Sequence, residues 1–362
     1  GGELCKRDRL TAGFMLRNAR QDIPVHGSVY PPVGGSIYDW RGEFAKPDIP
    51  KIGDNDILQR QTGAYLATRL KPTDDLAVIL GTRVSDFKGI DNTRYLDPNS
   101  PDARQRYQQT GVVTPYAGLV YDLNDSYSLY TSYTSIYQPQ MSKDIDGKIL
   151  DPVQGDSYEA GIKAEYLDGR VNASFAVFHT EQDNVAQLVD GWGIDAIYRP
   201  TKGATTKGFE VEVAGELSEG WNLSAGYSYN HTRDANHDYV YGSVLQSTEP
   251  QQVARLFSTY RLPGAWDRLT VGGGVNWQSQ FFGKVYQPDP SDTVNGGHDS
   301  RITQDGYFLV DAMARYQFSQ HLSSTLNVKN LFDKKYYTGI GNFSTGFYGE
   351  PRSLQLATRW DF

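Results

Sequence analysis

The side chains that could perform catalysis or bind a metal do not form a recognisable set in this sequence. The six histidines are His26, His179, His231, His237, His298 and His321. None of them stands at the HExxH spacing of a zinc enzyme. His231 and His237 flank one loop, and a solvated loop explains that pair more simply than a metal does. Asp289, Asp292 and Asp299 lie in another loop but miss the spacing of an EF-hand, so a solvated acidic loop is the simpler interpretation.

Sequence motifs for a catalytic nucleophile or a cofactor-binding loop are also absent. The sequence contains no GxSxG elbow. The three glycines at 272–274 are not followed by a helical pattern, so they indicate a strand that something approaches closely rather than a phosphate loop. Cys5 is the only cysteine, so it is either free or paired outside this chain. We therefore expect no enzyme, no metal site and no cofactor.

Carboxylates with a two-residue spacing are the most informative charged groups. In the segment 209–217, Glu210, Glu212 and Glu216 alternate with apolar residues such as Phe209 and Val211. Side chains alternate across a strand, so the carboxylates share one face. Burying even one unpaired carboxylate in lipid or a dry core is costly. The pattern predicts a strand with one apolar face and one face in a watery lumen.

Similar alternation recurs along the chain and predicts about fourteen strands. Hairpin signals such as Asp168-Gly169, a two-residue turn type, join them in pairs. A polar loop is expected from residue 89 to about Gln109. The last strand places Leu354, Leu356 and Trp360 on one face. The expected strands span residues 10–20, 58–70, 76–88, 111–122, 127–137, 157–167, 170–182, 206–217, 221–233, 253–262, 269–281, 304–318, 321–330 and 351–362.

Strands of a soluble β-sandwich also alternate apolar and polar residues. The regular succession of short turns and long loops favours a transmembrane antiparallel β-barrel instead. Strands of about a dozen residues exceed the usual length of 5–6. Mean hydropathy is −0.55, and no apolar run is long enough for a membrane helix. The 25 tyrosines suit membrane interfaces. A net charge of −8 argues against a nucleic-acid partner.

Residues near the end of the chain carry a family resemblance. The run from Asn330 to Tyr337 (NLFDKKYY), then Tyr348 to Arg352 (YGEPR) and a strand ending Trp-Asp-Phe, resembles the C-terminal signature of TonB-dependent outer-membrane receptors. The segments 155–166, 175–185, 207–213 and 220–227 look like hairpins of ferric-siderophore receptors in that family. The resemblance runs from about residue 58 to the end and points to the hydroxamate, coprogen and pyoverdine group.

Such receptors have a 22-stranded barrel, a plug domain and an N-terminal segment that recruits TonB. The resemblance therefore implies that residues 1–362 are the C-terminal part of a 22-stranded barrel, with the plug and TonB segment absent from this chain. It implies a monomer in the outer membrane of a Gram-negative bacterium. The implied partners are a ferric siderophore, TonB, and the lipid bilayer with its lipopolysaccharide.

The implied function is TonB-dependent uptake of a ferric siderophore, with a passive porin-like channel as the alternative and a barrel enzyme as a weaker third. Long aromatic loops favour the first, because porin constrictions use rings of charge, whereas a bulky organic chelate needs aromatic walls. Iron then arrives as a chelate and needs no protein metal ligands. The expected ligand-binding residues are Trp40, Tyr137, Trp192, Phe343 and Tyr348.

Overall fold

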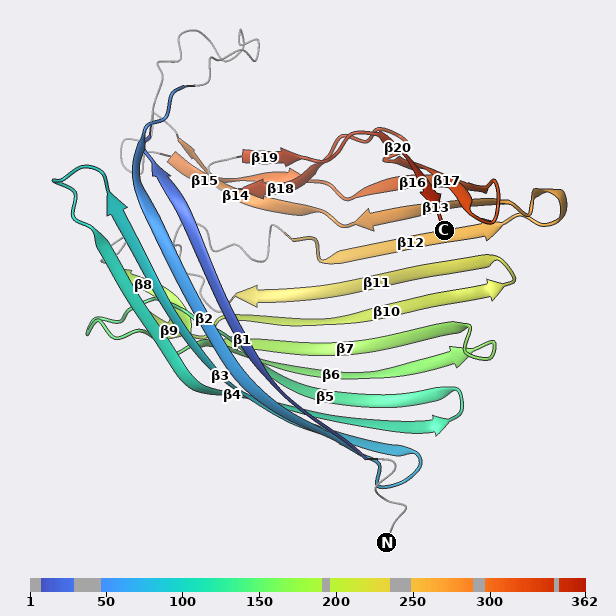
Figure 1. Ribbon diagram of the computed structural model, residues 1–362, viewed down its shortest axis with the longest axis horizontal. Coiled ribbons are helices and arrows are strands. Elements are labelled where there is room, and N and C mark those ends of the chain that lie inside the picture. Colours follow the sequence, from blue (N-terminus) through green and yellow to red (C-terminus); the bar gives the residue numbers. More distant parts are fainter. Residues whose placement is uncertain (1–7, 29–46, 191–195, 235–248, 289–296, 342–344) are drawn as a thin grey trace.

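One curved antiparallel sheet of fourteen strands dominates the computed structural model (Figure 1), which describes residues 8–28, 47–190, 196–234, 249–288, 297–341 and 345–362. Its strands follow chain order except where short hairpins intervene, so nearly every neighbour in sequence is a neighbour in space. The expected number of about fourteen strands is therefore confirmed. In sheet order they are β1 (Arg9–His26), β2 (Lys51–Leu70), β3 (Leu76–Tyr95), β4 (Ala103–Asn124), β5 (Tyr127–Gln138), β6 (Val153–Tyr166), β7 (Val171–Asp183), β10 (Ala204–Ser218), β11 (Trp221–Asp234), β12 (Gln252–Arg261), β13 (Leu269–Gln278), β16 (Tyr307–Gln317), β17 (Leu322–Lys329) and β20 (Ser353–Trp360).

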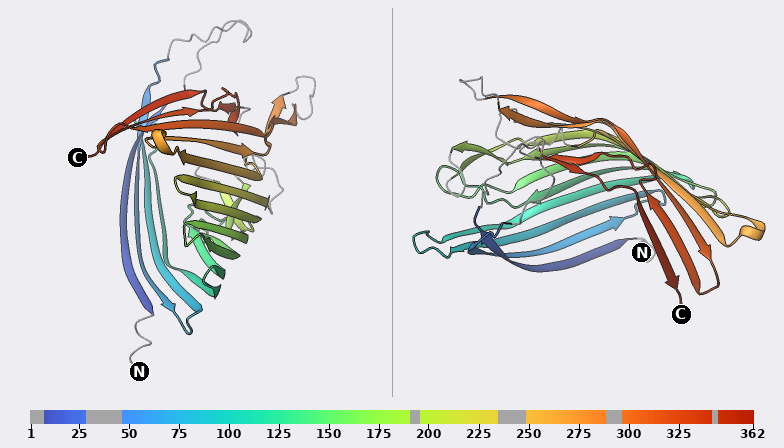
Figure 2. Two further views of the ribbon diagram at one scale, coloured as in Figure 1. Left: turned by 90° about the vertical axis from the view of Figure 1, so that its right-hand side faces the viewer. Right: turned by 90° about the horizontal axis from the view of Figure 1, so that it is seen from above.

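The sheet curls into a trough whose two edges are β1 and β20 (Figure 2). Tight turns join the strands at one end, which we call the turn end, and longer connections leave the opposite end, the loop end. We call the concave face the inner wall and the convex face the outer wall. Among the described residues, no helix is long and apolar enough to cross a membrane.

Three short two-stranded hairpins stand at the loop end. They pair β8 (Val185–Asp190) with β9 (Ile197–Thr201), β14 (Phe281–Pro288) with β15 (Gly297–Gln304), and β18 (Tyr337–Gly341) with β19 (Thr345–Tyr348). The sequence pattern did not predict them. At the turn end, a 3₁₀ turn, η4 (Gly264–Trp266), lies between β12 and β13.

Strand length falls steeply along the sheet. β2 has 20 residues and β4 has 22, whereas β12 has 10 and β20 has 8. A tilted strand needs about 9–11 residues to cross a bilayer. The extra length of β1 to β4 lies at the loop end, so these strands continue the wall beyond the membrane.

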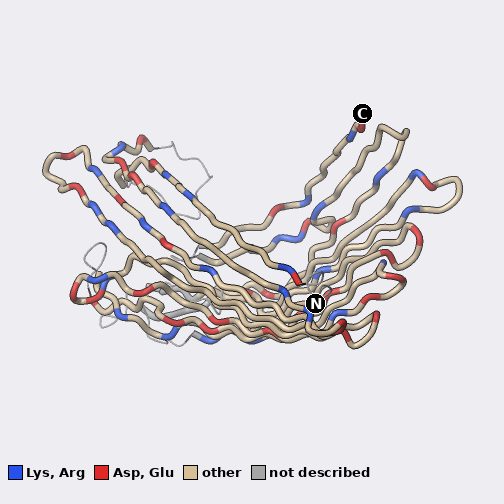
Figure 3. The backbone as a smooth tube through the Cα atoms, turned by 60° about the horizontal axis from the view of Figure 1, so that its bottom comes forward, with Lys and Arg blue, Asp and Glu red and all other residues tan. Residues whose placement is uncertain are grey.

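The expected polar loop ending near Gln109 is wrong, because residues 103–110 belong to β4. The outer halves of β1 to β4 carry charges of both signs (Figure 3). Arg20 and Arg94, for example, both donate to Asp56, at 3.1 and 2.8 Å. Beyond the membrane both faces of a strand meet water, so the apolar alternation that marks a lipid-facing strand is not required.

The Asp168-Gly169 hairpin is confirmed, but its loop is longer than predicted. Tyr166 pairs with Val171, which leaves four residues in the loop. Leu167, Asp168 and Gly169 all have positive φ, at 54°, 57° and 79°. Asp and Gly tolerate this left-handed conformation, so the dipeptide marked the turn without fixing its length.

Large apolar side chains cover the outer wall and leave little for a conventional core. Phe175, Val177 and Val211 are 43%, 45% and 37% exposed, and Leu354 and Leu356 are each 70% exposed. Water would disfavour so large an apolar surface, whereas lipid tails would favour it. The register gives the same two-faced pattern on neighbouring strands, so the outer wall is the lipid-facing side of a barrel.

Candidate functional site on the inner wall and loop end

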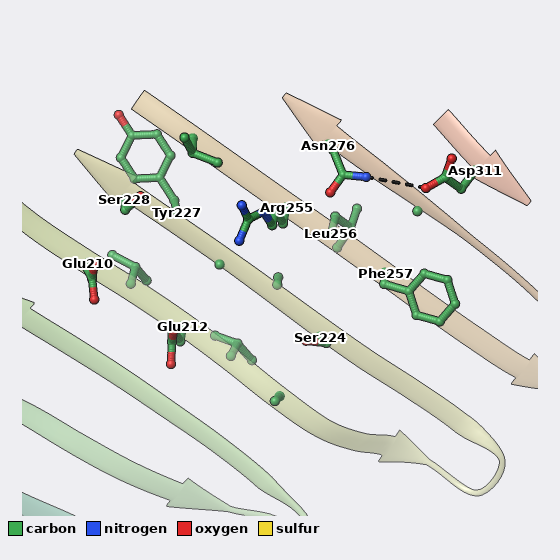
Figure 4. A pocket seen from close by; sticks show the side chains of 17 residues that line it. Glu210, Glu212, Ser224, Tyr227, Ser228, Arg255, Leu256, Phe257, Asn276 and Asp311 are labelled. Atoms are coloured by element: carbon green, nitrogen blue, oxygen red, sulfur yellow. Dashed lines mark hydrogen bonds between the residues drawn. The ribbon is translucent and has the colours of Figure 1, made fainter. Parts of the chain in front are cut away.

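A row of polar and small residues crosses the inner wall from β10 to β13. Glu212 pairs with Gly226, Gly226 with Arg255, and Arg255 with Asn276. Gly226 has no side chain, so the floor between Glu212 on β10 and Arg255 on β12 is open, and Figure 4 shows these two residues on either side of β11. The predicted placement of the carboxylates on a wet face is confirmed.

This row runs through a hollow of about 510 Å³ in the inner wall. Glu210 lies two residues before Glu212 on the same face, and Asp311 from β16 closes the far side, where Asn276 Nδ2 donates to its Oδ2 at 3.5 Å. Three carboxylates therefore accompany one guanidinium, that of Arg255, so the hollow is acidic. Its lining residues are Glu210, Val211, Glu212, Val213, Ala214, Ser224, Ala225, Gly226, Tyr227, Ser228, Val253, Arg255, Leu256, Phe257, Gly274, Asn276 and Asp311.

The polar surface continues onto β5 and β6. Tyr130 donates its hydroxyl to Glu159 Oε1 at 2.6 Å, and Lys163 Nζ lies 5.1 Å from the centre of the Tyr130 ring. A Cβ at Gly161 would come within 2.6 Å of that ring, so glycine is needed beneath it. This wall offers charge and hydrogen bonds to whatever fills the lumen.

Closer to the loop end, glutamine amides and aromatic rings form a second polar surface, the amide–aromatic shelf, made by Gln59, Gln61, Tyr107, Gln109 and Tyr137. Gln59 Nε2 donates to Tyr107 Oη at 3.4 Å, and Gln61 Nε2 donates to Tyr137 Oη at 3.3 Å. The second contact joins β2 to β5, although β3 and β4 separate them in the sheet. Only the concave side of a curved sheet allows such a contact, so the Tyr137 hydroxyl reaches the inner wall.

The shelf also holds the connection between β5 and β6. Gln109 Nε2 donates to the carbonyl of Leu150 at 3.1 Å, and both residues are buried. The amide of Tyr198 in β9 donates to the carbonyl of Lys143 at 2.8 Å. The other amide atom of Gln109, Oε1, is buried without a hydrogen-bond partner among the described residues. These hydrogen bonds to β4 and β9 hold residues 139–152 in place over the inner wall.

A small apolar core supports the hairpins β14–β15 and β18–β19. Phe281, Tyr307 and Ile340 are 2%, 6% and 5% exposed, and Tyr336 packs against them. The Tyr307 and Tyr336 rings lie 4.6 Å apart. A Cβ at Gly283 would lie 2.3 Å from Ile340 Cγ2, so a glycine there lets the two hairpins meet.

Tyr337 and Tyr348 form an aromatic pair on the second of these hairpins. Their ring centres are 4.8 Å apart, and the Tyr337 hydroxyl donates to that of Tyr348 at 3.3 Å. This hydrogen bond raises the pKa of Tyr337, because ionisation would remove the donated proton. Burial likewise raises the pKa of Tyr336. Both phenols are therefore neutral near pH 7 and remain hydrogen-bond donors.

Asn330 fastens the two ends of the segment that carries this hairpin. Its Nδ2 donates to the carbonyls of Lys334 and Glu350 at 2.9 and 3.0 Å, and its Oδ1 accepts from the Lys334 amide at 2.8 Å. Asp333 Oδ1 accepts from the Arg352 amide at 2.9 Å. The residues that carry the family resemblance at 330–352 therefore build the base of one outer loop.

Two of the five residues expected to bind ligand lie within the described part of the chain. Tyr137 contacts the amide–aromatic shelf, and Tyr348, which is 72% exposed, contacts Tyr337. They occupy different parts of the loop end, and their role remains a prediction. The other three, Trp40, Trp192 and Phe343, lie outside the described residues.

The remaining motifs take structural positions. Gly272 and Gly274 lie in β13, where a Cβ on Gly272 would come within 2.7 Å of the Ser258 carbonyl oxygen, which confirms a close approach. His231 Nε2 accepts from Arg233 Nε at 3.2 Å, whereas His237 lies outside the described residues. No group of three or more His, Cys, Asp or Glu in the described ranges is arranged to hold a metal.

A family model described as TonB dependent receptor-like, beta-barrel matches residues 8–331. A ferric-pyoverdine 358 receptor of Pseudomonas putida is 43% identical over 346 residues, which cover 93% of this chain and 40% of that protein. A ferripyoverdine receptor of Pseudomonas aeruginosa is 41% identical, covering 90% and 38%. The chain thus spans about two fifths of the curated relatives it matches.

Solved structures agree with these sequence relatives. The ferripyoverdine receptor of the outer membrane of P. aeruginosa, bound to ferripyoverdine, matches with a TM-score of 0.80 and 38% identity, covering 98% of this chain and 46% of that one. The alcaligin outer-membrane receptor of Bordetella pertussis matches with a TM-score of 0.68 and 32% identity, covering 97% and 50%. The similarity therefore extends over the whole fourteen-stranded sheet.

Proposed function

Since this chain belongs to the TonB-dependent receptor family and forms part of an outer-membrane β-barrel, we propose that it serves a receptor that takes up a ferric siderophore of the pyoverdine class. The proposal comes from curated relatives named as ferric-pyoverdine receptors. Uptake, ligand and the use of TonB are proposals for the whole protein, because the chain spans only about two fifths of those relatives.

The observation that best supports this function is the chemistry of the loop end. An iron chelate wrapped in an organic shell presents apolar surface and carbonyl oxygens rather than open metal sites. Aromatic rings and amide donors suit that surface. The shelf side chains Gln59, Gln61 and Tyr107, together with Tyr137 and Tyr348, supply both kinds of group.

A passive porin-like channel is not favoured, because the family is one of receptors and transporters. The inner wall agrees with that view. Porin selectivity relies on charged constrictions over an open channel. Here Glu210 and Glu212 face a broad floor of small residues such as Gly226 and Ser228. Such a floor leaves room for a plug domain within the lumen.

Alanine substitution at the five expected ligand-binding residues provides the test. We expect one or two of Trp40→Ala, Tyr137→Ala, Trp192→Ala, Phe343→Ala and Tyr348→Ala to weaken binding by more than about 2 kcal/mol, or roughly thirtyfold, because few residues dominate a binding site. The measurement is a filter-binding titration of radio-iron-labelled ferric pyoverdine against the complete receptor that carries this barrel segment.

Trp266→Ala is the matched control. Trp266 is 63% exposed, but it lies at the turn end, far from the outer loops. Its removal should leave the dissociation constant unchanged. If no ferric siderophore binds more tightly than micromolar, the proposed function is wrong. If one binds but all five variants match the parent, the ligand contacts are wrong and the function stands.

A further inference from the structure

Four arginines line the inner wall of β1 to β3, the strands that form one flank of the trough (Figure 2). The register pairs Gln61 of the amide–aromatic shelf with Arg17 on β1 and with Phe87 on β3, so these residues share the inner wall. Three more arginines on the same strands lie an even number of residues away and therefore share it too. We call Arg9, Arg17, Arg69 and Arg83 the arginine stripe.

Among the described residues, no carboxylate shares this part of the inner wall. Between the row of Arg69 near the turn end and the row of Arg17 at the shelf, the remaining inner positions of β1 to β3 are uncharged. Asp86 is the only acidic residue of these strands in that span, and it lies on the outer wall. On β3 and β4 the nearest inner-wall carboxylates, Asp91 and Asp122, lie beyond the two ends of the stripe. In the ranges that the structure describes, no ion pair engages the stripe.

Two members of the stripe are held in place or buried without their charge being neutralised. Arg83 Nε donates to Ser85 Oγ at 2.9 Å, and its Nη2 donates to Met15 Sδ at 3.6 Å. A Cβ at Gly63 would come within 3.1 Å of Arg83 Nε, so the guanidinium lies against a glycine. Arg69 Nε is buried, and no described residue accepts a hydrogen bond from it. An unpartnered buried donor is costly, so an acceptor that enters the lumen gains by binding there.

The stripe is spread evenly along the strands rather than clustered. Arg83 lies four residues from Phe87, which shares a row with Arg17. Ile79, which shares a row with Arg69, lies four residues further toward the turn end. Four residues of a strand span about 13 Å, so the stripe has three separate levels between the shelf and the turn end. Passage requires several weak sites rather than one strong site, because a ligand must also leave.

The opposite flank of the trough carries the opposite charge (Figure 2). The inner wall of β6, β7 and β10 holds five glutamates and one lysine, namely Glu159, Glu165, Glu210, Glu212, Glu216 and Lys163. An anion in the lumen is repelled by these carboxylates and attracted by the guanidinium groups across from them. Low-dielectric walls focus such a field within a cleft. The charge distribution therefore directs an anion toward β1 to β3.

We propose that the arginine stripe is the path along which an anionic ferric siderophore crosses the lumen. The chelate leaves the shelf beside Arg17, and its carboxylates then pair in turn with Arg83 and with Arg69 and Arg9. A guanidinium suits this role, because it stays charged and forms paired hydrogen bonds with a carboxylate. The inference rests on the proposed function and adds two properties to it: the flank of the lumen that the ligand follows and the negative charge that it carries.

The charge of the chelate is tested first, with the unmodified complete receptor. The probes are a radio-iron-labelled ferric pyoverdine with a free carboxylate and the same chelate with that carboxylate converted to an amide. Initial uptake is measured in energised cells at saturating ligand, and binding is measured in de-energised cells. We expect the amide to be taken up at least about threefold more slowly at equal occupancy, because a neutral hydrogen bond is about half as strong as a charge-assisted one. Equal rates would overturn the proposal, and this comparison needs no variant to fold.

The double variant Arg69→Gln and Arg83→Gln tests the path itself. It should lower the maximal uptake rate of the anionic chelate at least about tenfold and leave its dissociation constant unchanged, because two of the three levels lose a cation while the shelf is intact. The amide derivative should be slowed much less. The charge-conserving pair Arg69→Lys and Arg83→Lys should recover most of the rate.

Arg315→Gln is the matched control. Arg315 also lies on the inner wall, on β16, and its Nη2 donates to Gln317 and Ser323, so these partners do not neutralise its charge either. Because Arg315 lies outside the stripe, its removal should leave uptake unchanged.

The outcomes separate the path from the proposed function. If the parent takes up the chelate and the Gln double variant matches it, or slows both chelates equally, the path is overturned and the proposed function stands. If the Gln double variant admits vancomycin without any siderophore, the arginines hold a resident part of the receptor in the lumen, which also overturns the path. If the parent takes up no ferric siderophore, the proposed function and the path both fail.

Discussion

Replacing Val211 with arginine is expected to destabilise the barrel in lipid by about 2–4 kcal/mol, the usual cost of a cation on a lipid face near the bilayer midplane. Val211 lies at the centre of β10, is 37% exposed on the outer wall and pairs with Phe175 and Tyr227. An arginine at this depth is too far from either interface to place its charge in water. The measurement is a urea titration of the complete barrel folded into lipid vesicles, followed by tryptophan fluorescence.

Glu212→Gln, at the next residue, is the matched control. Glu212 faces the hollow of the inner wall beside Gly226, where water can reach it. Removing its charge should change the free energy of unfolding by less than about 0.5 kcal/mol, as at most surface sites. If the two substitutions destabilise the barrel equally, the assignment of inner and outer walls is wrong.

The membrane-spanning part of the fold could be predicted from the sequence because lipid imposes a strict pattern. Every crossing strand must present apolar residues to lipid at each second position. The alternation of Phe209 and Val211 with Glu210 and Glu212 is one instance, and the structure places these two pairs on opposite walls. The same rule correctly indicated fourteen strands.

Structure beyond the membrane escaped prediction because this constraint ends there. The hairpins β8–β9, β14–β15 and β18–β19 lie at the loop end, where both faces of a strand can meet water or a small local core. The outer part of β4, residues 103–110, is rich in Arg and Gln, so its sequence resembled that of a loop. In such segments pairing is set by register with the preceding strand, which no local pattern reveals.

A bulge explains why the amide–aromatic shelf was missed. The pairing of β3 with β4 shifts between Ser85 and Phe87, where the amide of Gly111, with φ of 67°, donates to Asp86 Oδ1 at 2.8 Å. The extra residue on β4 exchanges its two faces. Gln109 therefore shares the inner wall with Val112, although an unbroken alternation would place them on opposite sides. In the sequence, Gly111 was the residue that could have indicated this bulge, because glycine readily adopts a positive φ.

Replacing Asn330 with alanine is expected to release the last outer loop, at a local cost of about 3–4 kcal/mol. Asn330 is 5% exposed, and the substitution would leave the carbonyls of Lys334 and Glu350 without their side-chain donor. Its φ of 48° adds to the cost, because asparagine tolerates this conformation better than alanine. Hydrogen exchange across residues 331–352 of the complete receptor should measure the loss as faster exchange at the amides of Lys334 and Arg352.

Two variants separate the side-chain contacts from the general effect of substitution. Asn330→Asp keeps an acceptor for the Lys334 amide and tolerates the left-handed conformation, but it loses both donations, so its exchange should be intermediate. Asn327→Ala is the matched control, because Asn327 lies three residues earlier on the inner wall of β17 and its side chain makes no such contacts with the described residues. It should leave exchange unchanged. Because Tyr348 lies two residues before Glu350, ferric-pyoverdine binding should weaken in step with loop release. Normal exchange at 331–352 in Asn330→Ala would mean that the apolar core around Phe281, rather than the asparagine, holds this loop in place.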